Sequence, residues 1–122
     1  MTVMTEEEEQ RTLFEWAAMM EGRMPELKML FHVPNEGKRT AVSGGRMKAA
    51  GMKKGVPDLW LPVARAKYHG LVIELKRANG GKTTPEQDAW IAALTEQGYR
   101  AMVCHGWDEA RAAICAYLRE GV

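Results

Sequence analysis

The chain has 122 residues, 46% of them hydrophobic and 27% charged, the balance of a soluble globular protein with room for one domain, expected at residues 1–122. The formal net charge of +1 neither requires nor excludes a nucleic-acid partner. There is no run of roughly 18 apolar residues to cross a membrane, and the acidic N-terminal segment is unlike a secretion signal, so we expect a cytoplasmic protein.

The first predicted element is a helix that begins at Glu6. Thr5 offers a capping hydroxyl, and the run Glu6–Glu9 places carboxylates at the positive end of the helix dipole. Gly22 ends the helix. Apolar residues recur between these points at helical spacing: Leu13, Phe14, Ala17 and Met20.

A short strand and a basic segment follow. Residues 28–33 predict a strand, which the turn residues 34–37 close. Residues 38–54, here called the basic tract, predict a loop with a short helix such as 46–50, and they contain no acidic residue. A phosphate-facing surface and a solvated loop fit this composition equally well. The basic residues of the tract are Lys38, Arg39, Arg46, Lys48, Lys53 and Lys54.

The next segment predicts two strands and a helix. The strands span 57–63 and 70–76, and the second is apolar enough to lie at the centre of a sheet. The sequence Thr84-Pro85-Glu86-Gln87 is typical of a helix start, with a threonine cap and a proline at the first position. This helix ends near Gly98.

A strand at 99–104 and a helix at 108–118 complete the predicted elements. The order α-β-(α)-β-β-α-β-α predicts an α/β fold with a small mixed sheet flanked by helices. Cys104 and Cys115 form no C-x-x-C pair, so they indicate core residues rather than a disulfide or a zinc site.

Two carboxylates and an ammonium group are predicted to converge on these strands. Asp58 lies on the first strand, and Glu74 and Lys76 lie on the second. Because side chains alternate along a strand, Glu74 and Lys76 share one face while Leu75 turns into the core. Oxygen ligands of this kind, with room for water, suit Mg²⁺ or Mn²⁺. Such an ion stabilises charge on a phosphate, while the lysine orients or deprotonates the attacking water.

Each of these residues also has a plainer interpretation. Glu74 and Lys76 would form a surface pair on an edge strand, and Asp58 would cap a turn after Pro57. The apolar run that surrounds Glu74 argues against this, because a charged pair at the end of a buried strand is costly unless it has partners.

These residues resemble a known signature. Asp58…Glu74-x-Lys76 matches the PD-(D/E)XK nuclease pattern, which is a weak signal by itself. From roughly Glu6 to Leu118 the chain resembles the VRR-NUC family, the virus-type replication-repair nuclease domain. The matching strings are Gly55-Val56-Pro57-Asp58-Leu59, Ile73-Glu74-Leu75-Lys76, Gly81-Lys82, Gln87 and Gly98-Tyr99, with His32-Val33-Pro34-Asn35 and Thr84-Pro85-Glu86-Gln87 around them.

The resemblance implies a restriction-endonuclease-like fold, dependence on a divalent metal and cleavage of DNA phosphodiester bonds. It implies that Asp58 and Glu74 bind the metal, that the carbonyl of Leu75 is a further ligand, and that Lys76 is the catalytic lysine. Stand-alone members resemble homodimers that act on branched DNA, as a Holliday junction resolvase does. Two alternatives stay open: a monomeric nicking or flap nuclease, and a DNA-binding module of this fold without turnover.

The family also implies a glutamate on the first helix and a glutamine near the active site. We favour Glu6, because its i, i+7 spacing places it on one helix face with the apolar Leu13. Glu9 is the alternative, and the other glutamates of the run are expected to be solvated. Gln87 matches the glutamine, and it also completes a capping box with Thr84.

The resemblance favours contact between the basic tract and DNA phosphates through Lys48, Lys53 and Lys54, and Asn35 is expected to approach the DNA as well. The histidines lack metal-ligand spacing, and the four tryptophans are expected to pack in a core or interface. The first helix carries candidate dimer contacts, which alternatively wrap the monomer's own core: Phe14, Trp16, Met19 and Met20.

Overall fold

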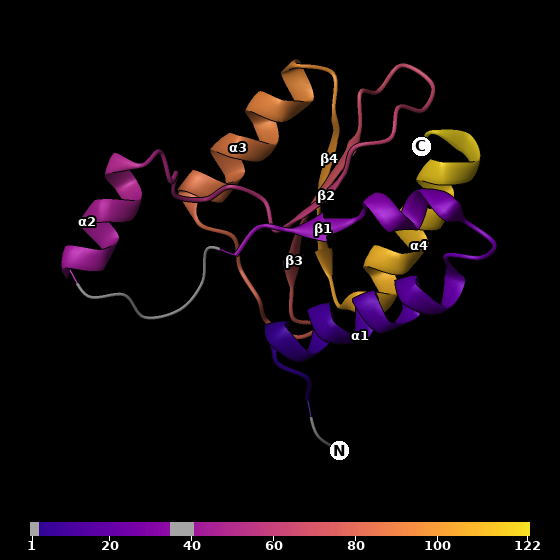
Figure 1. Cartoon of the computed structure of the whole chain (residues 1–122), viewed down its shortest axis with the longest axis horizontal. Helices are drawn as coiled ribbons and strands as arrows, with labels where there is room; N and C mark the ends of the chain where they lie inside the picture. The colour runs from indigo at the N-terminus through magenta and orange to yellow at the C-terminus, as the bar shows by residue number, and fades with distance from the viewer. Residues whose placement is uncertain (1–2, 35–40) are drawn as a thin grey trace.

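At the centre of the computed structural model, which describes residues 3–34 and 41–122, lies a mixed four-stranded β-sheet (Figure 1). β2 is antiparallel to both β1 and β3, whereas β3 and β4 run parallel. All six residues of β3 are buried, which confirms the prediction of a central strand. The strands in sheet order are β1 (Phe31–His32), β2 (Leu59–Leu61), β3 (Leu71–Lys76) and β4 (Arg100–His105).

Helices cover both faces of this sheet. α1 (Glu6–Met20) and α4 (Trp107–Glu120) pack against each other and against one face, while α3 (Pro85–Glu96) packs along β4 on the other side (Figure 1). The 3-10 helix η1 (Pro25–Met29) joins α1 to β1, and α2 (Ala41–Ala49) projects away from the sheet. This arrangement confirms the predicted α/β fold. None of the helices in the described ranges is long and apolar enough to span a membrane.

The main core fills the space between the sheet and the α1–α4 pair. Alternate residues of β3 face this core, and the residues between them therefore face the α3 side. The hydroxyl of Tyr117 on α4 donates a hydrogen bond of 2.6 Å to the carbonyl of Val63, which ties the closing helix to the segment after β2. The buried apolar cluster contains Leu13, Ala17, Leu27, Leu30, Leu59, Leu61, Leu71, Ile73, Leu75, Ile114 and Tyr117.

Three predicted element boundaries were wrong. The strand expected at 28–33 shrinks to β1, because Pro25 starts a 3-10 turn that takes the chain to Met29. The strand expected at 57–63 is only β2, because prolines flank it and lack the amide needed to extend the ladder. The helix expected at 46–50 begins earlier, since α2 spans Ala41–Ala49 and runs through the glycine pair at 44–45.

Candidate active site

Asp58, Glu74 and Lys76 come together where β2 meets β3. Leu59 pairs with Ile73, so Asp58 lies beside Glu74 on the neighbouring strand. A carboxylate oxygen of Asp58 (Oδ2) accepts a hydrogen bond of 2.9 Å from the amide of Leu75, and Lys76 Nζ lies 3.7 Å from Glu74 Oε2. All three charged side chains are buried. The expected convergence of two carboxylates and an ammonium group is therefore present in the fold.

Glu74 is the most electrostatically perturbed group of this cluster. Burial raises its pKa to about 9, and the hydrogen bond and negative charge of Asp58 push in the same direction. The ammonium of Lys76 opposes the shift, and the negative charge of Glu6 adds to it. In the metal-free protein, Glu74 therefore holds a proton at neutral pH.

One oxygen of Glu74 is a candidate metal ligand. Among the described residues, its Oε1 atom is buried and has no hydrogen-bond partner. No group of three or more His, Cys, Asp or Glu side chains in that part of the chain is arranged to hold a metal ion. Two carboxylates completed by backbone oxygen and water are the ligand set that Mg²⁺ accepts, because this ion keeps much of its water shell. The donors fit a hard divalent cation better than zinc.

The pKa of Glu74 predicts how stability changes with pH. The folded protein binds this proton more tightly than the unfolded chain, in which the pKa is near 4.5, so the stabilisation is complete below pH 4.5 and is lost as pH rises toward about 9. Glu74→Gln removes this loss of stability at high pH, because the side-chain amide of glutamine does not titrate. In EDTA, we expect the variant's Tm to match wild type below pH 4.5 and to exceed it by at least about 4 °C near pH 9.

Thermal unfolding followed by circular dichroism measures this difference. Glu96→Gln, at an exposed position near the end of α3, is the control and should show no pH-dependent difference. A Glu74→Gln effect that is the same at all pH values would contradict the assigned pKa.

Gln87 satisfies both of its sequence interpretations. Its side-chain Oε1 atom accepts a hydrogen bond of 2.9 Å from the backbone amide of Thr84. The backbone amide of Gln87 donates to Thr84 Oγ1 at 3.2 Å, and the two bonds form the capping box of α3. Its Nε2 atom donates to Glu74 Oε2 at 3.2 Å. Because the cap occupies the oxygen, the amino group is turned toward Glu74. The helix cap therefore sets the orientation of a side chain in the site.

Gly55 brings the segment before Asp58 against the start of α3. It has a φ of 88°, and a Cβ atom there would lie 2.7 Å from the backbone carbon of Glu86. Only glycine combines this conformation with so close an approach. The indole of Trp90 donates a hydrogen bond to the carbonyl of Lys54, which holds the end of the basic tract against the same helix.

Lysines form one wall of the site. A cavity of about 370 Å³, here called the active-site cavity, contains Asp58, Glu74 and Gln87, with the three lysines expected to bind DNA on its lining. The structure thus places Lys48, Lys53 and Lys54 around the carboxylates. Asn35 lies outside the described residues.

The two glutamates considered on α1 occupy different environments. Glu6 is exposed and lines the active-site cavity. Glu9 is only 3% exposed, and its carboxylate accepts hydrogen bonds from the amides of Trp107 at 2.9 Å and Ala78 at 3.2 Å. Glu9 therefore anchors α1 to the start of α4 and the end of β3. Glu9, the alternative to Glu6, is therefore occupied by backbone partners from distant parts of the chain.

The aromatic and cysteine predictions agree with the structure in part: Cys104 is buried as expected, but Cys115 is half-buried, and Trp60 and Trp90 lie outside the main core cluster. Trp16 and Trp107 pack against the core, and Trp60 donates to the carbonyl of Pro57. Both cysteines are free, and burial raises the pKa of Cys104 to about 12. Of the candidate dimer contacts on α1, Phe14, Trp16 and Met20 pack against the chain's own core, whereas Met19 is 82% exposed.

Known proteins share this architecture. The VRR-NUC domain model matches residues 3–108. A solved structure described as a VRR_NUC domain protein is 31% identical, with a TM-score of 0.83, over 97% of this chain and 91% of that chain. No curated protein matches. The fold, with its acid–acid–lysine cluster on adjacent strands, is that of a PD-(D/E)XK nuclease. Within that class the chain belongs to the VRR-NUC family.

Proposed function

We propose that this protein is a metal-dependent endonuclease that hydrolyses phosphodiester bonds in branched DNA and acts as a homodimer. The observation that carries metal dependence is Glu74 Oε1, which is buried beside Asp58 and lacks a hydrogen-bond partner among the described residues. A buried polar oxygen of this kind is costly unless a ligand satisfies it. A bound divalent cation would do so and would favour ionisation of both carboxylates.

Asp58, Glu74 and the Leu75 carbonyl are the proposed ligands of Mg²⁺ or Mn²⁺. The direction of the backbone supports the Leu75 carbonyl as a ligand. The carbonyl of the next residue, Lys76, points toward β4, where it accepts a hydrogen bond from the amide of Gly106. Backbone groups of successive strand residues point to opposite sides, so the Leu75 carbonyl faces the Asp58 side. When bound, the ion supplies positive charge to the phosphate and lowers the pKa of a water molecule.

Lys76, beside Glu74, and side chains of the cavity perform the rest of the reaction. Lys76, whose Nζ atom lies at the carboxylate of Glu74, orients the attacking water while it is charged, and it accepts a proton from that water only as the neutral amine. The water oxygen bonds to phosphorus as the bond from phosphorus to the leaving oxygen breaks. Gln87 keeps Glu74 in place, and Glu6 holds water at the mouth of the cavity. Lys48, Lys53 and Lys54 bind the DNA phosphates on either side of the scissile phosphate, and Asn35 approaches the same DNA strand.

Replacing Lys48, Lys53 and Lys54 together with glutamine is expected to weaken DNA binding for all sequences and to flatten its salt dependence. Each lost phosphate contact lowers the slope of log affinity against log salt by about 0.9 on duplex DNA, because fewer counterions are released. Fluorescence anisotropy over a salt series measures this slope.

A triple variant of exposed cations that do not line the cavity, Arg23→Gln, Lys28→Gln and Lys67→Gln, removes the same charge and serves as the control. If both triple variants show the same slope, the basic tract is a solvated loop rather than a phosphate contact.

The proposed function is tested with labelled linear, flapped and four-way DNA, each with Mg²⁺ and with EDTA, together with light scattering at micromolar concentration. We expect a dimer that cuts the four-way DNA fastest and only with Mg²⁺, because symmetric cutting needs two active sites. A monomer that cuts flaps or linear DNA equally well would indicate a nicking or flap nuclease. DNA binding without any cutting would indicate a binding module.

A further inference from the structure

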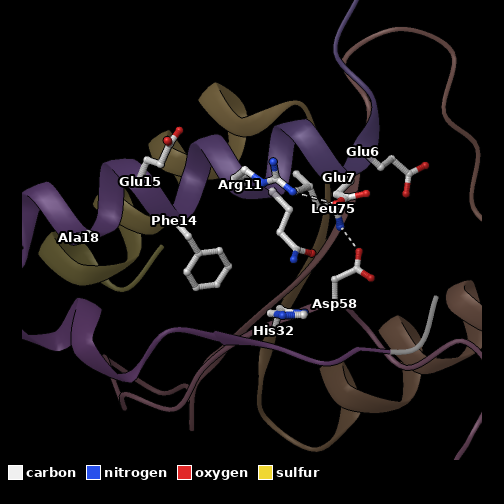
Figure 2. A pocket seen from close by; sticks show the side chains of 10 residues that line it. Glu6, Glu7, Arg11, Phe14, Glu15, Ala18, His32, Asp58 and Leu75 are labelled. Carbon is white, nitrogen blue, oxygen red and sulfur yellow. Dashed lines mark hydrogen bonds and ion pairs between the residues drawn. The ribbon is translucent and has the colours of Figure 1, made fainter. Parts of the chain in front are cut away.

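A second cavity adjoins the active-site cavity. It lies between α1 and β1, has a volume of about 690 Å³, and shares Asp58 and Glu6 with the active-site cavity. We call it the α1 groove. Figure 2 shows Phe14 projecting from α1 toward the ring of His32 on β1, with Asp58 and Leu75 at one end. A ligand in this groove would therefore lie directly beside the carboxylates.

The walls of the α1 groove suit a flat aromatic ligand. The rings of Phe14 and His32 stand edge to face, with centroids 6.1 Å apart and planes inclined at 68°. Ala18 and Leu75 add apolar lining. Phe14 is also packed against the core, which holds its ring in place. The volume lies within the range of pockets that bind small molecules, and aromatic rings are the surfaces on which nucleobases stack.

The charge of the α1 groove excludes the DNA backbone. Glu6, Glu7 and Glu15 line it, and Arg11 is already paired with Glu7 at 3.0 Å. These carboxylates repel phosphate, in contrast to the lysine wall of the active-site cavity. They only accept hydrogen bonds, which matches the exocyclic amino groups of adenine, cytosine and guanine. The two cavities thus favour different parts of one nucleotide: the lysines of the active-site cavity attract the phosphate, and the α1 groove suits the base.

We propose that the α1 groove binds an unpaired nucleobase of the DNA next to the scissile phosphate, stacked on one of the rings of Phe14 and His32 and in edge contact with the other. This inference rests on the proposed nuclease site, because Asp58 places the groove beside the phosphate to be cut. A base inside a duplex is stacked on its neighbours and cannot enter. The substrate class is therefore DNA in which a nucleotide beside the cut is unpaired or readily unpairs, as in a flap, at a mismatch or at the branch point of a four-way junction.

The test measures binding in EDTA, so that it does not depend on cleavage. Two duplexes of equal length are compared, one fully paired and one with a single unpaired 2-aminopurine, whose fluorescence reports its surroundings. We expect the unpaired DNA to bind about tenfold or more tightly, a typical effect of one stacked base. Its fluorescence should change on binding, and an abasic site at that position should remove the preference.

His32→Ala and Phe14→Leu are expected to lose this preference while still binding paired DNA. Phe31→Ala is the matched control, because Phe31 is an exposed aromatic on the same short strand that does not line the groove. Equal affinity for paired, unpaired and abasic DNA would overturn the proposal. So would variants that alter self-association in light scattering but leave the preference intact, which would make the groove an interface between copies.

The binding test in EDTA and the cleavage test with Mg²⁺ together separate the two proposals. A base preference in a protein that cuts no DNA with Mg²⁺ would refute the nuclease and keep the base site. Metal-dependent cutting without a base preference would support the nuclease and refute the base site.

Discussion

Asp58→Asn and Glu74→Gln are each expected to lower the rate of DNA cleavage in Mg²⁺ by about a thousandfold or more, with fold and DNA binding largely retained. An amide keeps the shape of the side chain but loses the charge that the proposed metal ligands need. Loss of metal-derived stabilisation worth several kcal/mol corresponds to this factor. The fold tolerates the first change because an asparagine oxygen still accepts the hydrogen bond of the Leu75 amide.

Single-turnover cleavage of labelled DNA measures the rate, and circular dichroism with anisotropy checks fold and DNA binding. Glu96→Gln again serves as the charge-matched control and should cut like wild type. Near-normal turnover by either active-site variant in Mg²⁺ would refute the assignment of the metal ligands.

Lys76→Ala is expected to lower the cleavage rate by about a hundredfold to ten-thousandfold while metal binding persists. The factor is typical of a group that transfers or orients a proton in the transition state. Lysine is a donor without a lone pair while it is charged, so it serves the water and the phosphate rather than the ion. Lys76→Met is a second variant that keeps the buried volume of the stem, because the side chain is only 8% exposed.

Calorimetric titration with Mg²⁺ or Mn²⁺ measures metal affinity in both variants. The titration is repeated at several pH values, because losing the Lys76 charge removes an influence that lowers the pKa of Glu74. If metal affinity is lost at every pH while the fold stays intact, Lys76 organises the site and does not act on the water.

Local patterns in the sequence were enough to predict the class of fold and the central strand. The apolar run of β3 predicted burial on both faces, and the alternation of side chains placed Glu74 and Lys76 together with Leu75 turned away. The capping box of α3 was also visible, because its residues lie within one turn of each other. These features depend on neighbours along the chain, so the sequence alone determines them.

Edge and boundary features were decided by the tertiary structure. β1 is an edge strand of only two residues, because the segment before it forms the 3-10 helix that begins at Pro25 and cannot extend the pairing with β2. Sequence patterns carry little information about where an edge strand ends, since the limits depend on which residues its neighbour can pair with.

The partners of individual side chains were likewise decided in three dimensions. The spacing of residues on α1 could not decide whether Glu6 or Glu9 lies at the active site. The two differ because the amides of Ala78 and Trp107, distant in the chain, bind Glu9, while Glu6 is left at the cavity. The same holds for Phe14, a candidate dimer or core contact, and for His32, which has no metal-ligand spacing: packing brings these two rings to one groove. A sequence determines the period and polarity of each element, whereas contacts between distant elements determine which side chains meet.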